Sequence, residues 1–223
     1  MKTTAIIVAA GSGSRFNSET PKQFLEINGK PVVVHAIERF EAAPSIDAIV
    51  LVLAKDQIGK LSLKQFTKLE SIVAGGDSRA ISVRSGLGAV PADTAIVAVH
   101  DGARPLVTVD EIERTIERAK ETGAACLVAA VTDTIKSIRG DEIAATLDRD
   151  QLRRALTPQA FKIEVLKRAF DGISLDETVT DECYLVERLG HPIAIVEGSV
   201  RNIKITHPED LILADALLNQ EIK

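Results

Sequence analysis

The chain has 223 residues, of which 45% are hydrophobic and 26% are charged, and its formal net charge is −5. This length supplies enough apolar residues to bury a core, so we expect residues 1–223 to form a single domain. The negative net charge argues against general binding to nucleic acid or to an anionic membrane surface. A region of positive electrostatic potential that binds an anion is therefore expected only at a particular site, where basic residues cluster.

Two features bear on where the protein works. The apolar run at 6–10 ends at Gly11 and is too short for a signal sequence, and no stretch of 18 apolar residues follows, so we expect a soluble, cytoplasmic protein. Cys126 and Cys183 make no CxxC or Cys/His pattern and are predicted to be buried, reduced thiols.

Strand-like and helical runs alternate along most of the chain. Short apolar runs predict strands at 4–10, 48–53, 71–74, 95–100, 126–131 and 193–197. Amphipathic segments predict helices at 32–43, 78–89, 108–122, 163–170, 181–189 and 208–219. Thr108 and Glu111 have capping-box spacing, and Pro208 suits a first helical turn. The alternation predicts an α/β fold, with a mostly parallel sheet and helices on both faces.

The alternation breaks between residues 132 and 154. Two β-prone runs, 134–138 and 143–147, flank Arg139-Gly140-Asp141 and predict a hairpin that projects from the body. An isolated two-stranded hairpin is marginal in water, so we expect this arm to pack on another surface. A second subunit is the natural partner.

The segment AAGSGSRF (9–16), directly after the first predicted strand, carries the strongest functional signal. Gly11 and Gly13 let backbone N–H groups approach an anion without interference from a Cβ atom, and two serines add hydroxyl donors. Arg15, and Lys22 in the following PKQF (21–24), add positive charge. The loop is therefore predicted to bind a polyphosphate.

Two other known glycine-loop motifs do not match this segment, and a third interpretation stays open. A Rossmann dinucleotide fingerprint fails because Phe16 stands where the third glycine or alanine belongs, and no acidic residue ends a strand about 20 residues on. A Walker A loop fails because Gly13 precedes Ser14-Arg15 rather than Gly-Lys-Ser/Thr. An ordinary turn with a solvated corner at Pro21 stays open on spacing alone.

Two more polar segments follow later strands: AGGDSR (74–79) and HDGARP (100–105). In parallel sheets, ligands bind beyond the carboxyl ends of the strands. We therefore expect these segments and the glycine loop to converge on one edge of the sheet.

These segments, in order with Ser82, DTIK (133–136), LDR (147–149), LTPQ (156–159), TDE (180–182) and NIKIT (202–206), resemble the 2-C-methyl-D-erythritol 4-phosphate cytidylyltransferase family of the non-mevalonate isoprenoid pathway. The resemblance spans nearly the whole chain and implies a Rossmann-like nucleotidyltransferase fold. It implies that a phosphomonoester oxygen attacks the α-phosphorus of CTP and releases pyrophosphate. It also implies a homodimer that exchanges arms. Because the charge of a triphosphate must be neutralised, we expect Mg²⁺ held mainly by the CTP phosphates, and no protein residue is predicted as its ligand.

The resemblance also implies roles for individual residues. The catalytic positions are Arg15, Lys22, Arg149 and Lys204. The nucleotide-binding positions are Ala9, Ala10, Gly11, Gly13, Gly76, Asp77 and Ser82, and the acceptor-binding positions are Asp101, Arg104, Thr134 and Thr157. Arm exchange would place Thr134 and Arg149 in the site of the neighbouring subunit.

Structural alternatives stay open for several of these positions. Asp77 or Ser78 suits an N-cap of the helix that contains Ser82, Asp101-Gly102 suits a turn, and Arg149 lies in a charge run typical of a solvated surface. None of the four histidines has a metal-ligand companion, which favours structural or solvated roles for His35, His100, His191 and His207. For the whole chain, the alternatives are a ribitol 5-phosphate cytidylyltransferase and a non-catalytic nucleotide-binding module.

Overall fold

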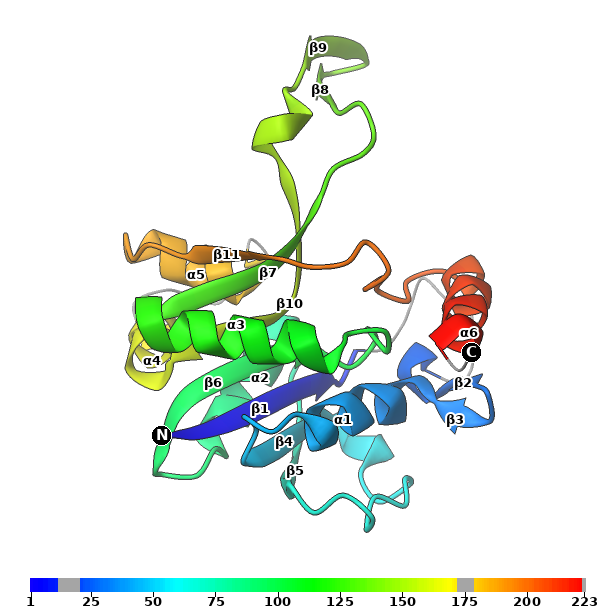
Figure 1. Cartoon of the computed structure of the whole chain (residues 1–223), viewed down its shortest axis with the longest axis vertical. Helices are drawn as coiled ribbons and strands as arrows, with labels where there is room; N and C mark the ends of the chain where they lie inside the picture. Colours follow the sequence, from blue (N-terminus) through cyan, green and yellow to red (C-terminus); the bar gives the residue numbers. More distant parts are fainter. Residues whose placement is uncertain (12–20, 172–178, 222–223) are drawn as a thin grey trace.

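A seven-stranded sheet forms the centre of the computed structural model, which describes residues 1–11, 21–171 and 179–221 (Figure 1). In spatial order its strands are β11 (Ala194–Glu197), β7 (Ala124–Ala130), β10 (Arg153–Lys162), β6 (Thr94–Asp101), β1 (Lys2–Ala9), β4 (Ala48–Leu53) and β5 (Leu69–Ala74). All pair in parallel except β10, which is antiparallel to both β6 and β7. The predicted mostly parallel sheet is confirmed.

Strand β10 is the one strand of this sheet that the sequence pattern did not predict. It contains Pro158, and a proline argues against a central strand because it cannot donate to the hydrogen-bond ladder. In the structure the register of β10 against β7 shifts between Ala155 and Gln159, so Pro158 falls where the ladder is interrupted. The proline is accommodated because no backbone donor is needed there.

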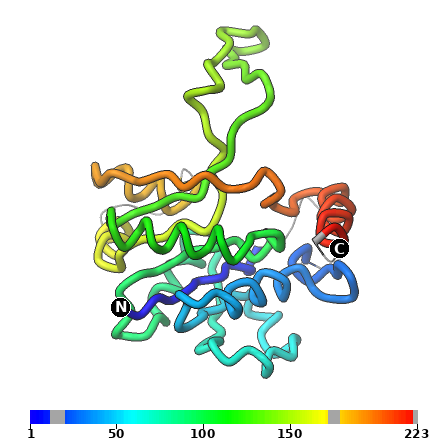
Figure 2. The backbone as a smooth tube through the Cα atoms, in the orientation of Figure 1, coloured from blue at the N-terminus to red at the C-terminus, as the bar shows by residue number. Residues whose placement is uncertain are grey.

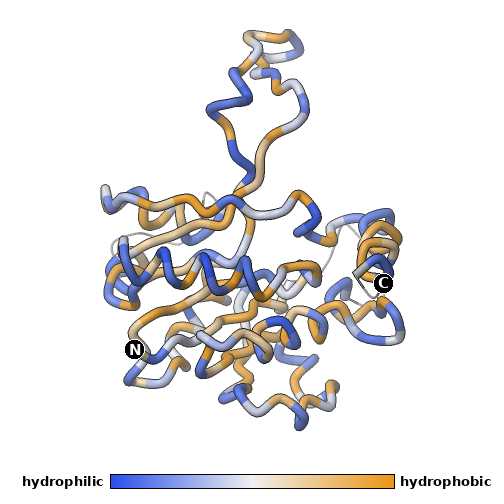
Figure 3. Tube along the Cα trace, in the orientation of Figure 1, coloured by the Kyte–Doolittle hydropathy of each residue, from blue (hydrophilic) through white to orange (hydrophobic). Residues whose placement is uncertain are grey.

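Helices cover both faces of the sheet, as predicted. On one face α1 (Val32–Ala42) packs on β1, and α3 (Val109–Thr122) packs on β7 and β10, around the core that contains Ala5 and Ile7 of β1. Ile6 of β1 faces the opposite core. That second core is covered by α2 (Arg79–Gly88), α4 (Ile163–Asp171) and α5 (Glu182–Arg188). Figure 3 shows the alternation of hydrophobic and hydrophilic residues along α3, and the predicted capping box of Thr108 and Glu111 begins this helix. In the described part of the chain, no helix is both long enough and apolar enough to cross a membrane.

Helix α6 (Pro208–Glu221) packs beside a small hairpin of β2 (Glu26–Ile27) and β3 (Lys30–Pro31), which the sequence pattern did not predict (Figure 2). Their shared apolar cluster includes Ile205, just before α6. The Ile205 backbone N–H donates to the carbonyl of Ala103 (2.8 Å), which ties this segment to the loop after β6. This contact brings Lys204 to the carboxyl edge of the sheet.

The predicted arm is present. Strands β8 (Lys136–Arg139) and β9 (Glu142–Thr146) form a two-stranded hairpin that projects from the body (Figures 1 and 2). Its turn uses Gly140 with φ of 59°, a backbone conformation that favours glycine. Ile138 and Ile143 of the hairpin are 74% and 65% exposed, so these two side chains are not buried in a core formed by the described residues.

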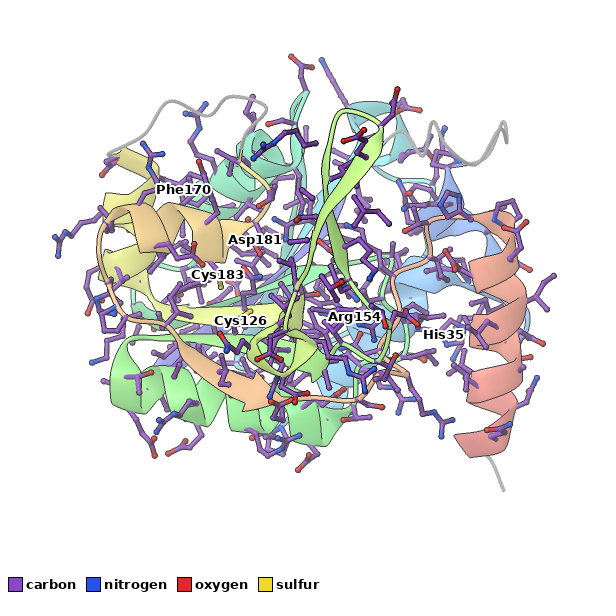
Figure 4. The ribbon with its side chains drawn as sticks, turned by 90° about the horizontal axis from the view of Figure 1, so that it is seen from above. His35, Cys126, Arg154, Phe170, Asp181 and Cys183 are labelled. Atoms are coloured by element: carbon purple, nitrogen blue, oxygen red, sulfur yellow. The ribbon has the colours of Figure 1, made fainter. Side chains whose placement is uncertain are left out.

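Both cysteines are free and buried, as predicted. Cys126 of β7 and Cys183 of α5 belong to the same core and lie next to each other (Figure 4). The adjacent Cys126 thiol and burial raise the pKa of the Cys183 thiol. Cys183 is therefore not a ready nucleophile.

Candidate active site

A cavity of about 460 Å³ opens beyond the carboxyl ends of β1, β5 and β6. The sheet order changes direction at β1, because the chain continues outward through β4 and β5 and then returns to β6 on the other side of β1. Open α/β sheets bind ligands at such a point. The sequence-predicted site residues that line the cavity are Ala9, Ala10, Gly11, Lys22, Gly76, Asp77, Ser82, Asp101 and Lys204.

The buried side chain of Gln23 holds the start of the loop after β1. Its Nε2 donates to the carbonyls of Ala9 (2.8 Å) and Gly11 (2.9 Å). A Cβ atom at Gly11 would meet nothing within 4 Å among the described residues, so the approach to its backbone is open. The predicted residues Gly13 and Arg15 lie outside the described part of the chain. This role of Gln23 is not among the sequence predictions. The PKQF segment (21–24), which the predictions use only for Lys22, also contains Gln23.

The loop after β5 is held by hydroxyl groups. Ser78 caps α2 by accepting from the Ile81 N–H (3.2 Å), which decides between Asp77 and Ser78 as the cap. The Ser82 hydroxyl donates to the Ser78 carbonyl (2.9 Å) and accepts from the Gly76 N–H (3.1 Å). The Asp77 carboxylate is therefore not used as the helix cap and lies at the cavity.

A buried carboxylate, Asp101, organises the positive charges on the other side of the cavity. Its Oδ1 accepts from Arg79 Nε (2.8 Å), and its Oδ2 contacts Lys204 Nζ (2.8 Å) and lies 3.7 Å from Arg104 Nε. Burial alone would raise the pKa of Asp101, but Arg79, Lys204 and Arg104 hold it well below its usual value. Asp101 therefore stays charged and fixes Lys204 at the cavity.

Two predicted acceptor residues lie behind Asp101 and do not line the cavity. The buried Thr157 accepts from the Asp101 backbone N–H through its Oγ1 (3.1 Å). Arg104 donates from Nη1 to the Asn202 carbonyl (2.8 Å), and burial lowers the pKa of its guanidinium. Both residues support the position of Asp101 in this chain.

The buried His100 completes the support behind Asp101, so of the structural and solvated roles predicted for it, the structure shows the structural one. Its Nε2 lies 3.1 Å from the Arg104 carbonyl, which can only accept, so Nε2 carries the proton. Its Nδ1 then accepts from the Thr157 hydroxyl at 2.9 Å. Burial lowers the pKa of His100 to about 4, so the ring is neutral near pH 7.

This neutral histidine predicts a pH-dependent stability. Because the pKa of His100 is about 4 in the folded protein and 6.5 is the ordinary value, the unfolded chain binds more protons between these limits, and stability falls as the pH falls. The free energy of unfolding is expected to decrease by about 2 kcal/mol more between pH 7 and pH 5 in the wild type than in His100→Gln. Denaturant titrations at both pH values measure this difference. The exposed His207→Gln is the matched control, and a wild-type pH dependence in His100→Gln would contradict the assignment.

Thr134 and Arg149 belong to the arm and do not reach the cavity of their own chain. Arg149, at the start of the short helix η4 (Arg149–Gln151), donates from Nη1 to the Thr132 carbonyl (2.7 Å) across the base of the arm. The structure therefore brings together the described body residues of the predicted site, with Arg104 and Thr157 behind the cavity lining, and leaves Thr134 and Arg149 apart from them.

The cavity is poorly suited to holding a metal ion by protein ligands alone. Both oxygens of Asp101 are engaged by cations, and the described residues contain no group of three or more His, Cys, Asp or Glu side chains arranged around a common point. Magnesium is often held by one or two carboxylates together with substrate phosphates and water. The few free carboxylate oxygens of the cavity therefore suit a magnesium ion that enters bound to substrate phosphates better than one held permanently by the protein.

An open α/β sheet with a cationic cavity at its switch point is typical of nucleotide-binding proteins of the Rossmann-like class. The family model for 2-C-methyl-D-erythritol 4-phosphate cytidylyltransferase matches residues 3–220. A relative of that name from Syntrophus aciditrophicus is 44% identical over 229 residues, which cover 99% of this chain and 97% of that protein. The chain belongs to the 2-C-methyl-D-erythritol 4-phosphate cytidylyltransferase family.

Solved structures agree with this assignment. The 4-diphosphocytidyl-2C-methyl-D-erythritol synthase of Anaerococcus prevotii superposes with a TM-score of 0.86 at 31% identity, covering 98% of this chain and 96% of that one. The 2-C-methyl-D-erythritol 4-phosphate cytidylyltransferase of Thermus thermophilus gives a TM-score of 0.79 at 32% identity, with 98% and 100% covered. The similarity extends over the whole fold, including the predicted Rossmann-like architecture.

Proposed function

We propose that this chain transfers a cytidylyl group from CTP to 2-C-methyl-D-erythritol 4-phosphate, giving 4-diphosphocytidyl-2-C-methyl-D-erythritol and pyrophosphate. Family membership supports the reaction. One observation supports the assignment of the site: Gly11 and Lys22 line the same cavity as the Asp101–Lys204 pair. We assign the part near Gly11 and Lys22 to the nucleotide and the part near Asp101 and Lys204 to the acceptor.

The reaction is a direct displacement. An oxygen of the acceptor phosphate forms a bond to the α-phosphorus of CTP, and the bond from that phosphorus to the bridging oxygen breaks, so that its electron pair leaves with pyrophosphate. No covalent enzyme intermediate is required. The protein therefore has to hold two anions in line and stabilise the negative charge that develops between them.

On the nucleotide side, we assign Lys22 and Arg15 to the α-phosphate, where cations stabilise the pentacovalent phosphorus. Ala9, Ala10, Gly76, Asp77 and Ser82 surround the space assigned to cytosine, whose exocyclic amine needs an acceptor. The Asp77 carboxylate is available for this contact because Ser78 caps α2. Gly11 and Gly13 let the loop backbone approach the phosphates.

On the acceptor side, we assign Lys204 and Arg149 to the acceptor phosphate and Asp101 to the polyol. We assign Thr134 to the same site, and Arg104 and Thr157 to the support of Asp101 from behind. Arg149 and Thr134 do not line the cavity of their own chain, and the arm exposes Ile138 and Ile143. Both observations support a homodimer in which each arm completes the site of the partner subunit.

Two further properties are part of the proposal. Magnesium, when bound, neutralises part of the triphosphate charge, and we assign it mainly to phosphate oxygens because Asp101 is engaged by cations. The free, buried thiols of Cys126 and Cys183 suit a reducing compartment, and we place the enzyme in the cytoplasm.

Substrate choice provides the direct test. With CTP and magnesium, 2-C-methyl-D-erythritol 4-phosphate is expected to release pyrophosphate, and ribitol 5-phosphate is expected to react far more slowly, because HDGARP and LDR resemble the methylerythritol branch. A coupled pyrophosphate assay with each acceptor at several concentrations measures both kcat/KM values. Equal or faster turnover of ribitol 5-phosphate would reassign the acceptor. CTP binding without turnover of either would indicate a non-catalytic nucleotide-binding module.

A further inference from the structure

We propose that Glu182 of α5 is a positioning residue for the acceptor side of the cavity, and that it acts through Arg79 on Asp101 and Lys204. The inference rests on the acceptor role proposed for Asp101 and Lys204. Neither Glu182 nor Arg79 was among the site residues predicted from the sequence, although both lie in segments that carried the family resemblance.

The four side chains form a line of alternating charge that leads from α5 to the cavity. Arg79 bridges two carboxylates, since its Nε donates to Asp101 Oδ1 (2.8 Å) and its Nη1 donates to Glu182 Oε1 (2.6 Å). The second oxygen of Asp101 contacts Lys204 Nζ at 2.8 Å. Each Asp101 oxygen is thus held by a different cation at hydrogen-bonding distance.

Glu182 fixes the orientation of the Arg79 guanidinium. The Nε and Nη1 donors lie on different edges of the planar group, so the bond from Nη1 to Glu182 and the bond from Nε to Asp101 together set its plane and its rotation. In this orientation Arg79 holds Asp101 at Oδ1, and Oδ2 contacts Lys204. Without the charge of Glu182, Arg79 is free to turn, and the Asp101 carboxylate loses the contact that fixes its rotation. Glu182 therefore sets the position of the lysine through Arg79 and Asp101, without touching it.

The carboxylate of Glu182 has little freedom to move away from Arg79. The Glu182 side chain is fully buried, and within the described residues its Oε2 has no hydrogen-bond partner, so Arg79 is what compensates its burial. The two neighbours of Glu182 in the sequence are both hydrogen-bonded to Gln159 of β10. Asp181 accepts from Gln159 Nε2 (2.8 Å), and Gln159 Oε1 accepts from the Cys183 N–H (3.0 Å), which places α5 as Figure 4 shows.

The test is Glu182→Gln, which keeps the shape of the side chain and removes its charge. We expect the KM for 2-C-methyl-D-erythritol 4-phosphate to rise by about 10-fold, while the KM for CTP changes by less than about 2-fold. A crystal structure of this variant is expected to show Arg79 turned away from Asp101 Oδ1, with the Asp101 carboxylate rotated and Lys204 Nζ beyond hydrogen-bonding distance of Oδ2. Arg79→Lys is expected to raise the same KM, because a flexible ammonium group does not hold two carboxylates in the fixed geometry of a planar guanidinium. Because both residues act along one path, the acceptor KM of the double variant should not exceed that of the more impaired single variant.

Glu113→Gln is the matched control. Glu113 is a partly buried carboxylate that accepts from the backbone and hydroxyl of Ser45, away from the cavity, so its loss should change the unfolding temperature and neither KM. An unchanged acceptor KM in Glu182→Gln, or an intact Lys204–Asp101 contact in its structure, would overturn the positioning role. Absence of turnover in the wild type would instead refute the proposed function, and the crystal structure would still decide the positioning role.

Discussion

The Lys22→Ala protein is expected to fold normally, and its kcat is expected to be about 100-fold or more below that of the wild type, by analogy with the removal of one oxyanion donor. Lys22 lines the cavity beside the glycine loop, where negative charge grows at the α-phosphorus as the new bond forms. A cation at that point stabilises the transition state more than it stabilises bound CTP, so its loss appears in kcat. Arg15→Ala is expected to behave in the same way.

Steady-state kinetics with both substrates at saturating concentration measure this effect. The exposed Lys64→Ala is the matched control, because it removes the same charge outside the cavity lining and should leave kcat unchanged. If Lys22→Ala kept a near-normal kcat and only raised the KM for CTP, its role would be ground-state binding of the nucleotide.

Arm exchange predicts that two inactive proteins restore activity when they are mixed. If Arg149 acts in the partner's site and Lys204 in its own, each site of a twofold dimer uses both chains. Arg149→Ala and Lys204→Ala chains, unfolded together and refolded in equal amounts, then form mixed dimers with both defects in one site and none in the other. About half of the dimers are mixed, so roughly a quarter of wild-type activity should return.

The control for this experiment is the pair Lys22→Ala and Lys204→Ala. Both residues line the same cavity within one chain, so every site of a mixed dimer carries one defect and no activity should return. Two different affinity tags on the chains, with sequential pull-down, establish that mixed dimers have formed. Mixed dimers of the Arg149 and Lys204 variants without recovered activity would show that the arm is not exchanged.

Local patterns were enough to predict most helices and strands. Strand β4 has the predicted bounds, Ala48–Leu53, because its apolar run is bounded by clear breaks. Helix α3 begins at the predicted capping box because both partners, Thr108 and Glu111, lie within one turn. The convergence of three polar segments was also predictable, since the carboxyl ends of parallel strands meet at one edge. Individual residue roles came from the family resemblance rather than from periodicity.

Tertiary structure alone decided where β10 lies and how the charges around Asp101 are paired. The partners Arg79 and Glu182 are 103 residues apart, and no local pattern links them. Strand order brings β6 beside β10, and α5 then packs against β10 through Gln159, which places Glu182 beneath Arg79. A local pattern reports only interactions among residues a few positions apart, whereas this buried charge network exists only after the sheet and its covering helices have assembled.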